Sequence, residues 1–418
     1  MKDYEASSVE DEVLTEAART FGTPCYVYFC DRIESRIQEL SAAFGGRFSQ
    51  SFAAKCNPNP GVLEFLNSRI DFLDVSSIGE LRLALQAGWH PSQASFTGPG
   101  KREFEIREAI ENGIGELVIE SVREALIADQ IAASLDRRQN VLLRLSPTSV
   151  PKGFGDRMAG QPCAFGIDAE AMASEIPKIQ SLKNISICGL HIYSGTQSLN
   201  PAAICENYQN FVGLFQECCT EFDITPQKLI FGSGLGVAYH EKDVPLDLDA
   251  IANETNAVLD ALKQQPRFSN TQLILELGRY LVGDAGFFVT RVISVKESRG
   301  SRIGICDGGL NNHLPASGNF GMVIRRNYKM HKIGKLVQPG ERVDLVGPLC
   351  TSIDKLATGI TLPRISEGDL IAIHNSGAYG LTASPIHFIS HKPPSEVIVN
   401  EHGLVDVTRQ LGDISHVS

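Results

Sequence analysis

Three glycines at alternate positions follow a short apolar run near the middle of the chain. Gly232, Gly234 and Gly236 come directly after Leu229-Ile230-Phe231. Because glycine has no side chain, such a loop lets backbone N–H groups approach an anion, which predicts a phosphate site. The spacing G-x-G-x-G differs from the G-x-G-x-x-G of dinucleotide-binding loops, and no clear helix start follows it. A dinucleotide site and a plain turn remain the alternatives.

Other polar residues stand at the ends of short apolar runs. Lys55 follows Phe52-Ala53-Ala54, and Glu276 and Arg279 end the run that begins at Leu273. An amine, a phosphate cradle and an inward carboxylate together suggest pyridoxal 5′-phosphate (PLP), which needs an amine for its Schiff base and a partner for its ring nitrogen. The further polar residues at run ends are Asp74, Arg144, His191 and Tyr193.

Each of these residues also has an interpretation without a cofactor. Lys55 alone is typical of a solvated loop lysine, and Glu276 and Arg279 could form a structural ion pair. His191 alone is typical of a core histidine with satisfied hydrogen bonds. The combination is more specific than any one of its members.

From residue 50 onward, short β-like runs alternate with amphipathic segments, a rhythm typical of parallel strands joined by helices. The clearest helices are expected over 79–85, 103–112 and 201–222. Eight strands are predicted, over 52–54, 72–75, 94–97, 117–119, 141–145, 188–192, 229–231 and 273–277.

Eight strand-helix pairs over about 230 residues match the size of a (β/α)₈ barrel, with a doubly wound open sheet as the alternative. In such a barrel, chemistry sits at the carboxyl ends of the strands and phosphate at the loops after strands seven and eight. Those two loops carry Gly232-Ser233-Gly234 and Gly278-Arg279. The glycine loop therefore lies where the barrel predicts a phosphate.

After residue 284 the rhythm changes to short strands separated by turns, such as 287–292 and 370–373. We therefore predict a barrel over 30–284 and a second, β-rich domain formed by 1–29 plus 285–418. The N-terminal residues are expected to join the second domain through Tyr26-Val27-Tyr28-Phe29.

The composition favours a protein that acts on small molecules. The chain has 418 residues, of which 43% are hydrophobic, and a net charge of −11. Its lysines and arginines form no isolated cluster, so we expect neither a nucleic-acid nor a membrane partner. The N-terminus lacks the pattern of a signal peptide, and no apolar run could span a bilayer, which predicts a cytoplasmic protein. No two of the ten cysteines are spaced C-x-x-C, so we expect reduced thiols and no metal site.

From about Tyr26 to Val399, the chain resembles the fold-type III PLP-dependent decarboxylases, which include the diaminopimelate, ornithine and arginine decarboxylases. The likeness implies an alanine-racemase-like fold, in which a β-rich domain accompanies the barrel. The segments that carry the resemblance are "FAAKCNPN", "DVSSIGEL", "GLHIYSGTQ", "FGSGLG", "ELGR", "GPLCTSID" and "NSGAYG".

The resemblance assigns roles to single residues. It implies that Lys55 is the Schiff-base lysine, that Glu276 contacts the pyridine nitrogen, and that Cys350 is the catalytic proton donor. A carboxylate at the ring nitrogen favours decarboxylation, whereas racemases on a related barrel place an arginine there. The remaining cofactor contacts that it implies are Asp74, Arg144, His191, Tyr193, Thr196, Gly232, Ser233, Gly234, Gly278, Arg279 and Tyr379.

The resemblance further implies a homodimer in which the cysteine segment of one subunit completes the site of the other. Two departures bear on the substrate. Tyr193 replaces the family's cofactor-stacking histidine, and Thr351 replaces the glutamate that helps diaminopimelate decarboxylases recognise the distal end of their substrate. The changed motifs look more like the branch that serves siderophore and antibiotic assembly.

We therefore predict decarboxylation of an L-amino acid or a side-chain-acylated derivative. The alternatives are a diaminopimelate, ornithine or arginine decarboxylase of primary metabolism, a racemase, and a catalytically inactive regulatory homologue. Cys350, Thr351 and Asp354 are predicted substrate contacts. For its far end the candidates are His313, Arg325, Arg326 and His387, with a solvated surface position as the alternative for each arginine.

Overall fold

The computed structural model describes residues 8–318, 326–334 and 339–409. Its backbone contacts divide the chain into two compact units. Of the described residues, 34–237 and 244–281 form the barrel unit, and 8–33, 238–243 and those between 282 and 409 form the β-rich unit. Arg325, one of the predicted substrate contacts, lies outside the described residues.

The barrel unit is a closed ring of eight parallel strands. Each strand pairs with its neighbours in parallel, β12 returns to pair with β2, and the β5–β6 pairing completes the ring. The closed ring confirms the predicted (β/α)₈ barrel and excludes the doubly wound sheet, which is open. The strands in ring order are β2 (Ser49–Ala53), β3 (Phe72–Val75), β4 (Ala94–Phe96), β5 (Glu116–Ile119), β6 (Gln139–Ser146), β9 (Ile185–Ile192), β11 (Lys228–Gly232) and β12 (Gln272–Leu277).

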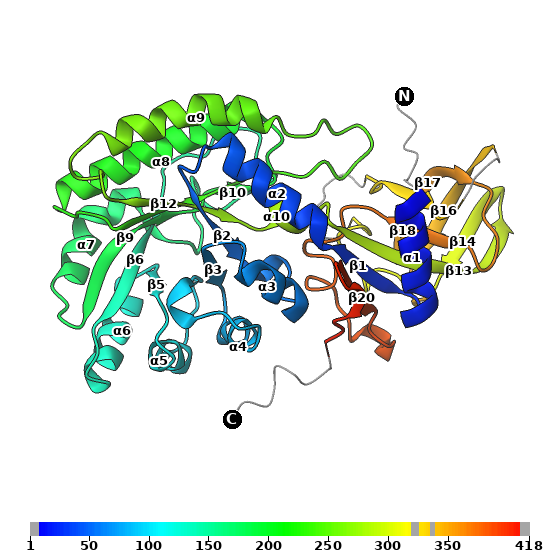
Figure 1. The fold of residues 1–418 in the computed structure, drawn as a ribbon, viewed down its shortest axis with the longest axis horizontal. Helices are drawn as coiled ribbons and strands as arrows, with labels where there is room; N and C mark the ends of the chain where they lie inside the picture. Colours follow the sequence, from blue (N-terminus) through cyan, green and yellow to red (C-terminus); the bar gives the residue numbers. More distant parts are fainter. Residues whose placement is uncertain (1–7, 319–325, 335–338, 410–418) are drawn as a thin grey trace. The chain divides into compact units, whose positions relative to one another are not determined.

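Helices lie on the outside of these strands (Figure 1). Several begin at a polar residue whose side chain accepts a hydrogen bond from the first turn, as Ser77 does from the Glu80 N–H and Asn200 from the Ala203 N–H. Helix α2 (Cys30–Ala43) precedes β2, and the helices between the strands are α3 (Pro60–Asn67), α4 (Ile78–Gln86), α5 (Glu103–Glu111), α6 (Val122–Ser134), α7 (Met172–Gln180), α8 (Pro201–Glu221) and α9 (Leu248–Lys263). The three helices predicted from the sequence correspond to α4, α5 and α8.

One apolar layer fills the inside of the barrel. Its members come from five different strands, one from each, and all are buried. Because side chains alternate between the two faces of a strand, the residue two positions further along β6 and β12 also points inward, while on β9 a register irregularity beside Cys188 brings His191 to that level. This layer, called the barrel floor below, lies directly beneath the polar residues at the carboxyl ends of the strands. It consists of Val118, Leu142, Cys188, Ile230 and Ile274.

The β-rich unit contains a nine-stranded sheet in which β1 (Cys25–Phe29) pairs antiparallel with β13 and parallel with β19. Helix α1 (Ser8–Phe21) packs Leu14, Ala17 and Ala18 against the β1 and β13 side chains. The other strands of the sheet are β13 (Gly286–Ser298), β14 (Ser301–Cys306), β15 (Met330–Lys332), β16 (Gly340–Val346), β17 (Lys355–Pro363), β18 (Leu370–Ile373), β19 (Ser395–Asn400) and β20 (Gly403–Asp406).

All ten cysteines are free thiols, and Cys163 and Cys350 are the two exposed ones. Of the helices in the described ranges, none combines the length and the apolar character that a bilayer crossing requires.

Candidate functional site

A polar layer stands above the apolar floor at the carboxyl ends of the barrel strands. Glu276 lies two residues beyond Ile274 on β12, and Arg144 lies two residues beyond Leu142 on β6. His191 pairs in register with Arg144, so strand β9 brings it to the same level. The period of two thus gathers buried charged groups from separate strands at one end of the barrel.

Glu276 and His191 form the centre of this layer. The His191 Nε2 atom lies 2.9 Å from Glu276 Oε2, and both side chains are almost fully buried. Burial by itself would raise the pKa of Glu276, but the hydrogen bond and the attraction of His191 outweigh it and lower the pKa. The charges of Lys55 and Arg144 act in the same direction. Glu276 is therefore held as a carboxylate in a site that excludes water.

Asp74, at the end of β3, is a second buried carboxyl group in the same layer. Burial, followed by the charge of Glu276, raises the pKa of Asp74 to about 8. Its Oδ1 atom accepts hydrogen bonds from the hydroxyls of Thr97 and Ser95. The attraction of Lys55 opposes the shift without cancelling it. The pKa of Asp74 is thus raised while that of its neighbour Glu276 is lowered, and such divergent shifts are typical of functional sites.

Arg144 is oriented by Glu120, the residue directly after β5. The guanidinium Nη1 lies 3.1 Å and 3.2 Å from the two Glu120 oxygens, and both side chains are buried. Glu120 also accepts the backbone N–H groups of Gly98 and Gly166, at 2.8 Å and 2.9 Å. Because its carboxylate is fully occupied, Glu120 fixes the direction of Arg144 and does not itself offer a contact to a ligand.

Lys55 lies in a short 3-10 helix, Ala54–Cys56, immediately after β2. It is half-buried, and its Nζ atom lies 5.4 Å from the centre of the Tyr193 ring. Its charge acts on Glu276, Asp74 and Glu80, which places the amine beside the polar layer. Tyr193 therefore presents an aromatic face next to the amine, at the position where family members carry a stacking histidine.

The glycine loop lies directly after β11. Gly234 has a φ of 66°, in the left-handed region that favours glycine. A side chain at Gly232 would place its Cβ 2.4 Å from the Tyr193 ring, and one at Gly234 would place it 2.6 Å from Phe154. The Ser233 N–H donates to the Glu276 carbonyl at 3.0 Å, which ties the loop to β12. Gly232 is thus required by the close approach of the Tyr193 ring, and Gly234 by the close approach of Phe154 and by its left-handed backbone conformation.

Two further predicted phosphate contacts flank this loop. Thr196 lies in β10 (Gly195–Thr196), which pairs with β7 (Asp156–Arg157). Arg279 begins helix α10 (Arg279–Val282) just after β12. A Cβ at Gly278 would meet its nearest neighbour, Cys56 Sγ, at an ordinary 3.4 Å, so crowding does not explain the glycine there.

The barrel unit fits PLP in several observed respects. The His191 Nδ1 and Asp74 Oδ2 atoms are buried and have no hydrogen-bond partner within the described part of the chain. Unsatisfied buried polar atoms are costly and are commonly found where a ligand completes them. An amine, an ionised carboxylate and a side-chain-free loop surround them, which are the three groups that this cofactor requires.

In the β-rich unit, Asp354 organises the loop that carries Cys350. Its two carboxylate oxygens accept the N–H groups of Leu310 and Leu349 at 2.7 Å and 2.8 Å, and the side chain is buried. Burial raises the pKa of Asp354, against the effect of these two hydrogen bonds. Cys350 itself is exposed and Thr351 is half-buried. Asp354 thus holds the backbone directly before Cys350 through its hydrogen bond with the Leu349 N–H.

The other predicted contacts of this unit differ in accessibility. His313 is fully buried against the rings of Tyr26, Phe288 and Tyr328, and burial lowers its pKa to about 3. Its Nε2 atom lies 2.9 Å from the Ser376 hydroxyl. These surroundings favour a structural histidine over a contact with the substrate.

His387 is exposed, and Tyr379 is half-buried with a left-handed φ of 58°. Arg326 is 47% exposed and forms an ion pair with Asp243. This partly exposed ion pair agrees with the alternative that Arg326 is a solvated surface residue. The substrate roles of these residues stay predictions.

Comparison with known proteins identifies the family. Residues 30–283 match the family model described as the pyridoxal binding domain of pyridoxal-dependent decarboxylases. The chain belongs to the PLP-dependent decarboxylases. The predicted membership in the fold-type III enzymes is thereby confirmed, as are the carboxy-lyase class and the PLP cofactor.

Relatives of this decarboxylase cover nearly its whole length. The L-glutamyl-(BtrI acyl-carrier protein) decarboxylase of Niallia circulans is 32% identical over 97% of this chain and 95% of that protein. The diaminopimelate decarboxylase of Aquifex aeolicus is 30% identical over 98% of this chain and 94% of that protein. The crystal structure of diaminopimelate decarboxylase from Helicobacter pylori complexed with L-lysine has a TM-score of 0.83 and 27% identity, covering 96% of this chain and 98% of that one.

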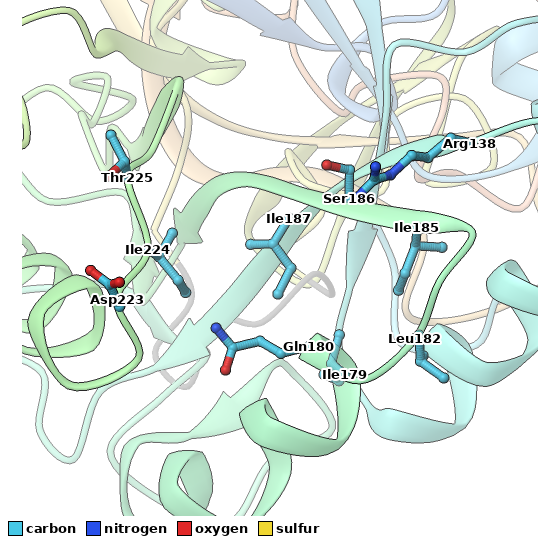
Figure 2. Close-up of a pocket in the computed structure, with 10 residues that line it drawn as sticks. All are labelled: Arg138, Ile179, Gln180, Leu182, Ile185, Ser186, Ile187, Asp223, Ile224 and Thr225. Carbon is cyan, nitrogen blue, oxygen red and sulfur yellow. The ribbon is translucent and has the colours of Figure 1, made fainter.

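A separate pocket of about 290 Å³ opens at the other end of the barrel (Figure 2). Ile185, the first residue of β9, lies in its wall, as do residues that precede β6 and β11. It is therefore remote from the polar layer along the strands. Its lining residues are Arg138, Ile179, Gln180, Leu182, Ile185, Ser186, Ile187, Asp223, Ile224 and Thr225.

Sequence reasoning missed two residues that shape the site. Glu120 directly follows a predicted strand, so the rule that selected Asp74 and Arg144 could also have selected Glu120. Tyr208, whose hydroxyl reaches the glycine loop, lies in the middle of α8, where an aromatic residue usually means core packing. No sequence signal distinguishes it.

Proposed function

We propose that this decarboxylase removes the α-carboxylate of an L-amino acid whose side chain is acylated or otherwise loaded, in siderophore or other secondary-metabolite biosynthesis. The observation that carries the proposal is Thr351, a neutral residue next to the exposed Cys350. Diaminopimelate decarboxylases have a glutamate at this position, so a distal ammonium group would lose its charge partner here. The Niallia circulans relative, whose name specifies a glutamyl group on a carrier protein, supports the same direction.

The proposed roles follow from the geometry of the barrel unit. Lys55 would hold the cofactor covalently, and the Tyr193 ring lies beside that amine. Glu276 is ionised and is oriented by His191. Because the site excludes water, this carboxylate stabilises a positive charge on the ring nitrogen. PLP, when bound, supplies the electron-accepting ring that makes loss of carbon dioxide possible. The glycine loop, Thr196 and Arg279 would hold its phosphate through N–H, hydroxyl and guanidinium donors.

In the β-rich domain, proposed to comprise residues 1–29 plus 285–418, Cys350 returns the proton after carbon dioxide leaves. A thiol is suited to this step because its pKa can be tuned near the working pH. Asp354 holds the cysteine loop from behind through two backbone N–H groups. Thr351 is then the side chain placed to discriminate between substrates.

The active assembly is proposed to be a homodimer with shared sites. Ile353, close in sequence to Cys350, is 54% exposed, and Phe388 and Ile389 are 45% and 44% exposed. The charge of His391 acts on Asp354, which lies behind the cysteine loop. Large apolar side chains exposed in these segments support a surface that a partner covers.

A diaminopimelate, ornithine or arginine decarboxylase of primary metabolism is the second candidate. Diaminopimelate decarboxylases of Aquifex aeolicus and Methanothermobacter thermautotrophicus are 30% and 31% identical to the chain, nearly as similar as the carrier-protein enzyme. An inactive regulatory homologue is less well supported, because Lys55, Glu276, Arg279 and Cys350 are all present.

The experiment is a product screen by mass spectrometry with the PLP-loaded enzyme. Free meso-diaminopimelate, L-ornithine, L-arginine and L-glutamate are compared with side-chain-acylated and carrier-protein-linked L-amino acids. The proposal expects loss of carbon dioxide mainly from the second group. Fast turnover of diaminopimelate and none of any loaded amino acid would refute it.

Thr351→Glu sharpens the same test. Restoring a carboxylate should raise kcat/KM for diaminopimelate about tenfold or more, because one ion pair of moderate strength adds at least that factor. Thr351→Gln is the matched control, since it has the same shape without the charge. Equal effects of Glu and Gln would argue against a charge-based role of this position.

A further inference from the structure

The glycine loop is held by backbone groups of Glu276 and Ser198 and by one side chain from outside the cofactor site, that of Tyr208. Four of its backbone groups have partners in the barrel unit. The Ser233 N–H donates to the Glu276 carbonyl at 3.0 Å, and the Gly236 N–H donates to the Ser198 carbonyl at 2.9 Å. The Gly234 carbonyl accepts the Ser198 N–H at 3.0 Å, and the Ser233 carbonyl accepts the Tyr208 hydroxyl at 2.7 Å. Of these partners, only Tyr208 acts through a side chain.

The Tyr208 bond determines which way one peptide group faces. The Ser233 carbonyl belongs to the peptide that also carries the Gly234 N–H. In a trans peptide these two groups point in opposite directions, so the Gly234 N–H faces away from Tyr208. Among the residues described, neither the Gly234 N–H nor the following Leu235 N–H donates to a protein acceptor. Two successive unpaired N–H groups at a left-handed glycine form the kind of concavity that binds anions.

Tyr208 is too deeply buried to touch a ligand directly. Its side chain is 1% exposed, and its ring packs with Phe48, Phe211 and Phe231 at centroid distances of 6.5 Å, 6.1 Å and 6.1 Å. Burial raises its pKa well above the usual value, so the hydroxyl remains a proton donor. The adjacent Asn207 accepts the Ser194 hydroxyl at 2.9 Å, so the same helix also holds the loop after β9.

We propose that Tyr208 is a positioning residue for the cofactor phosphate: its hydroxyl holds the Ser233 carbonyl and thereby aims the Gly234 N–H at the phosphate group. The inference rests on the proposed role of the glycine loop as the phosphate site. Helix α8 thus supplies one of the contacts that preorganise the loop, and ligand binding does not have to turn the peptide.

The test compares PLP with pyridoxal, which lacks the phosphate, as ligands of the apo form of the full-length protein. Tyr208→Phe removes only the hydroxyl and keeps the aromatic packing. We expect it to weaken PLP binding roughly fivefold, the effect of one hydrogen bond, and to leave pyridoxal binding unchanged. Both dissociation constants are measured by absorbance titration, with thermal unfolding as a check of folding.

Tyr26→Phe is the matched control. Tyr26 is also fully buried, and its hydroxyl also donates to a backbone carbonyl, that of Asn312 at 2.6 Å, in the β-rich unit. It should lose comparable stability while the ratio of the PLP and pyridoxal dissociation constants stays at the wild-type value. A change of this ratio in Tyr26→Phe equal to that in Tyr208→Phe would overturn the inference.

The remaining outcomes separate the inference from the proposed function. If the wild type prefers PLP over pyridoxal and Tyr208→Phe keeps the same preference, Tyr208 does not position the phosphate, although the glycine loop can still bind it. If Tyr208→Phe weakens the binding of PLP and of pyridoxal equally, Tyr208 has only a structural role, and the inference is overturned. If the wild type binds PLP no more tightly than pyridoxal, the phosphate site itself fails, and the inference fails with it.

Discussion

The two ends of the barrel follow the same folding rules but treat their buried charges differently. At the amino end, Lys228 pairs with Glu116 at 2.5 Å and lies over the Phe72 ring, and the Gln139 amide donates to three carbonyls. At the carboxyl end, Asp74 and His191 each keep a buried polar atom without a partner in the described residues. The amino-end groups named here find their partners within the protein, whereas the two carboxyl-end atoms are available to a ligand.

This difference separates stability from function along the same strands. A satisfied ion pair contributes to the folded state and nothing to the reaction, while an unsatisfied group costs stability and is available for binding. Substitutions at the carboxyl end should therefore change activity most, and those at the amino end should change only the free energy of unfolding.

Among the variants that keep Lys55, the largest expected effect belongs to Glu276→Gln. The amide keeps the shape but removes the buried charge that His191 orients, so kcat should fall about 10²- to 10³-fold, as for loss of a preorganised electrostatic contact. The measurement is steady-state carbon dioxide release by the PLP-loaded enzyme. An unchanged kcat would mean that the carboxylate is structural, like those at the amino end.

Asp74→Asn should change how stability depends on pH. Between the usual aspartate pKa, near 4, and the folded value of about 8, the folded state holds a proton that the unfolded state has lost. Wild-type stability therefore falls as the pH rises through this range, by at most about 1.4 kcal/mol per pH unit from this group.

In the apo protein, Asp74→Asn should thus gain stability over the wild type as the pH rises from 5 to 8, measured by urea unfolding. Asp260→Asn is the control, because Asp260 is exposed and its pKa is lowered by the Arg47 hydrogen bond. A gap that stays constant with pH would contradict the raised pKa of Asp74.

Glu116→Gln tests the amino end. Breaking the pair leaves the Lys228 ammonium largely buried, which should cost about 3 kcal/mol of unfolding free energy. The kcat of the PLP-loaded enzyme should remain within about twofold of wild type, because the barrel floor separates this pair from the polar layer. A drop in kcat comparable to that of Glu276→Gln would abolish the distinction between the two ends.

The smallest effect is expected for Arg138→Ala, in the pocket of Figure 2. Arg138 is exposed, so the change should stay within about 0.5 kcal/mol in chemical unfolding and leave kcat unaltered. A clear loss of activity in this variant would reveal a role for the amino-end pocket in the reaction.

The barrel and its polar layer could largely be predicted from the sequence. Each of the eight predicted strands overlaps an observed one, and the rule that chemistry sits at strand ends selected Asp74, Arg144 and Glu276. Their placement at one end of the barrel was predictable because strand periodicity and parallel order determine which side chains meet there.

Contacts between distant segments could not be predicted in this way. The hydrogen bond from Tyr208 to Ser233 and the two backbone N–H groups bound by Asp354 depend on how loops fold back, which no periodicity encodes. The burial of His313 was missed for the same reason, because its surrounding rings come from residues 26, 288 and 328.

The most direct test of the account concerns Lys55, the amine beside the polar layer. Purified enzyme loaded with PLP is reduced with borohydride, digested, and analysed by peptide mass spectrometry. The account predicts a phosphopyridoxyl group on the peptide that contains Lys55, and none in the Lys55→Ala variant, which should also lack decarboxylase activity. A label on another lysine in the wild type, or full activity of Lys55→Ala, would contradict it.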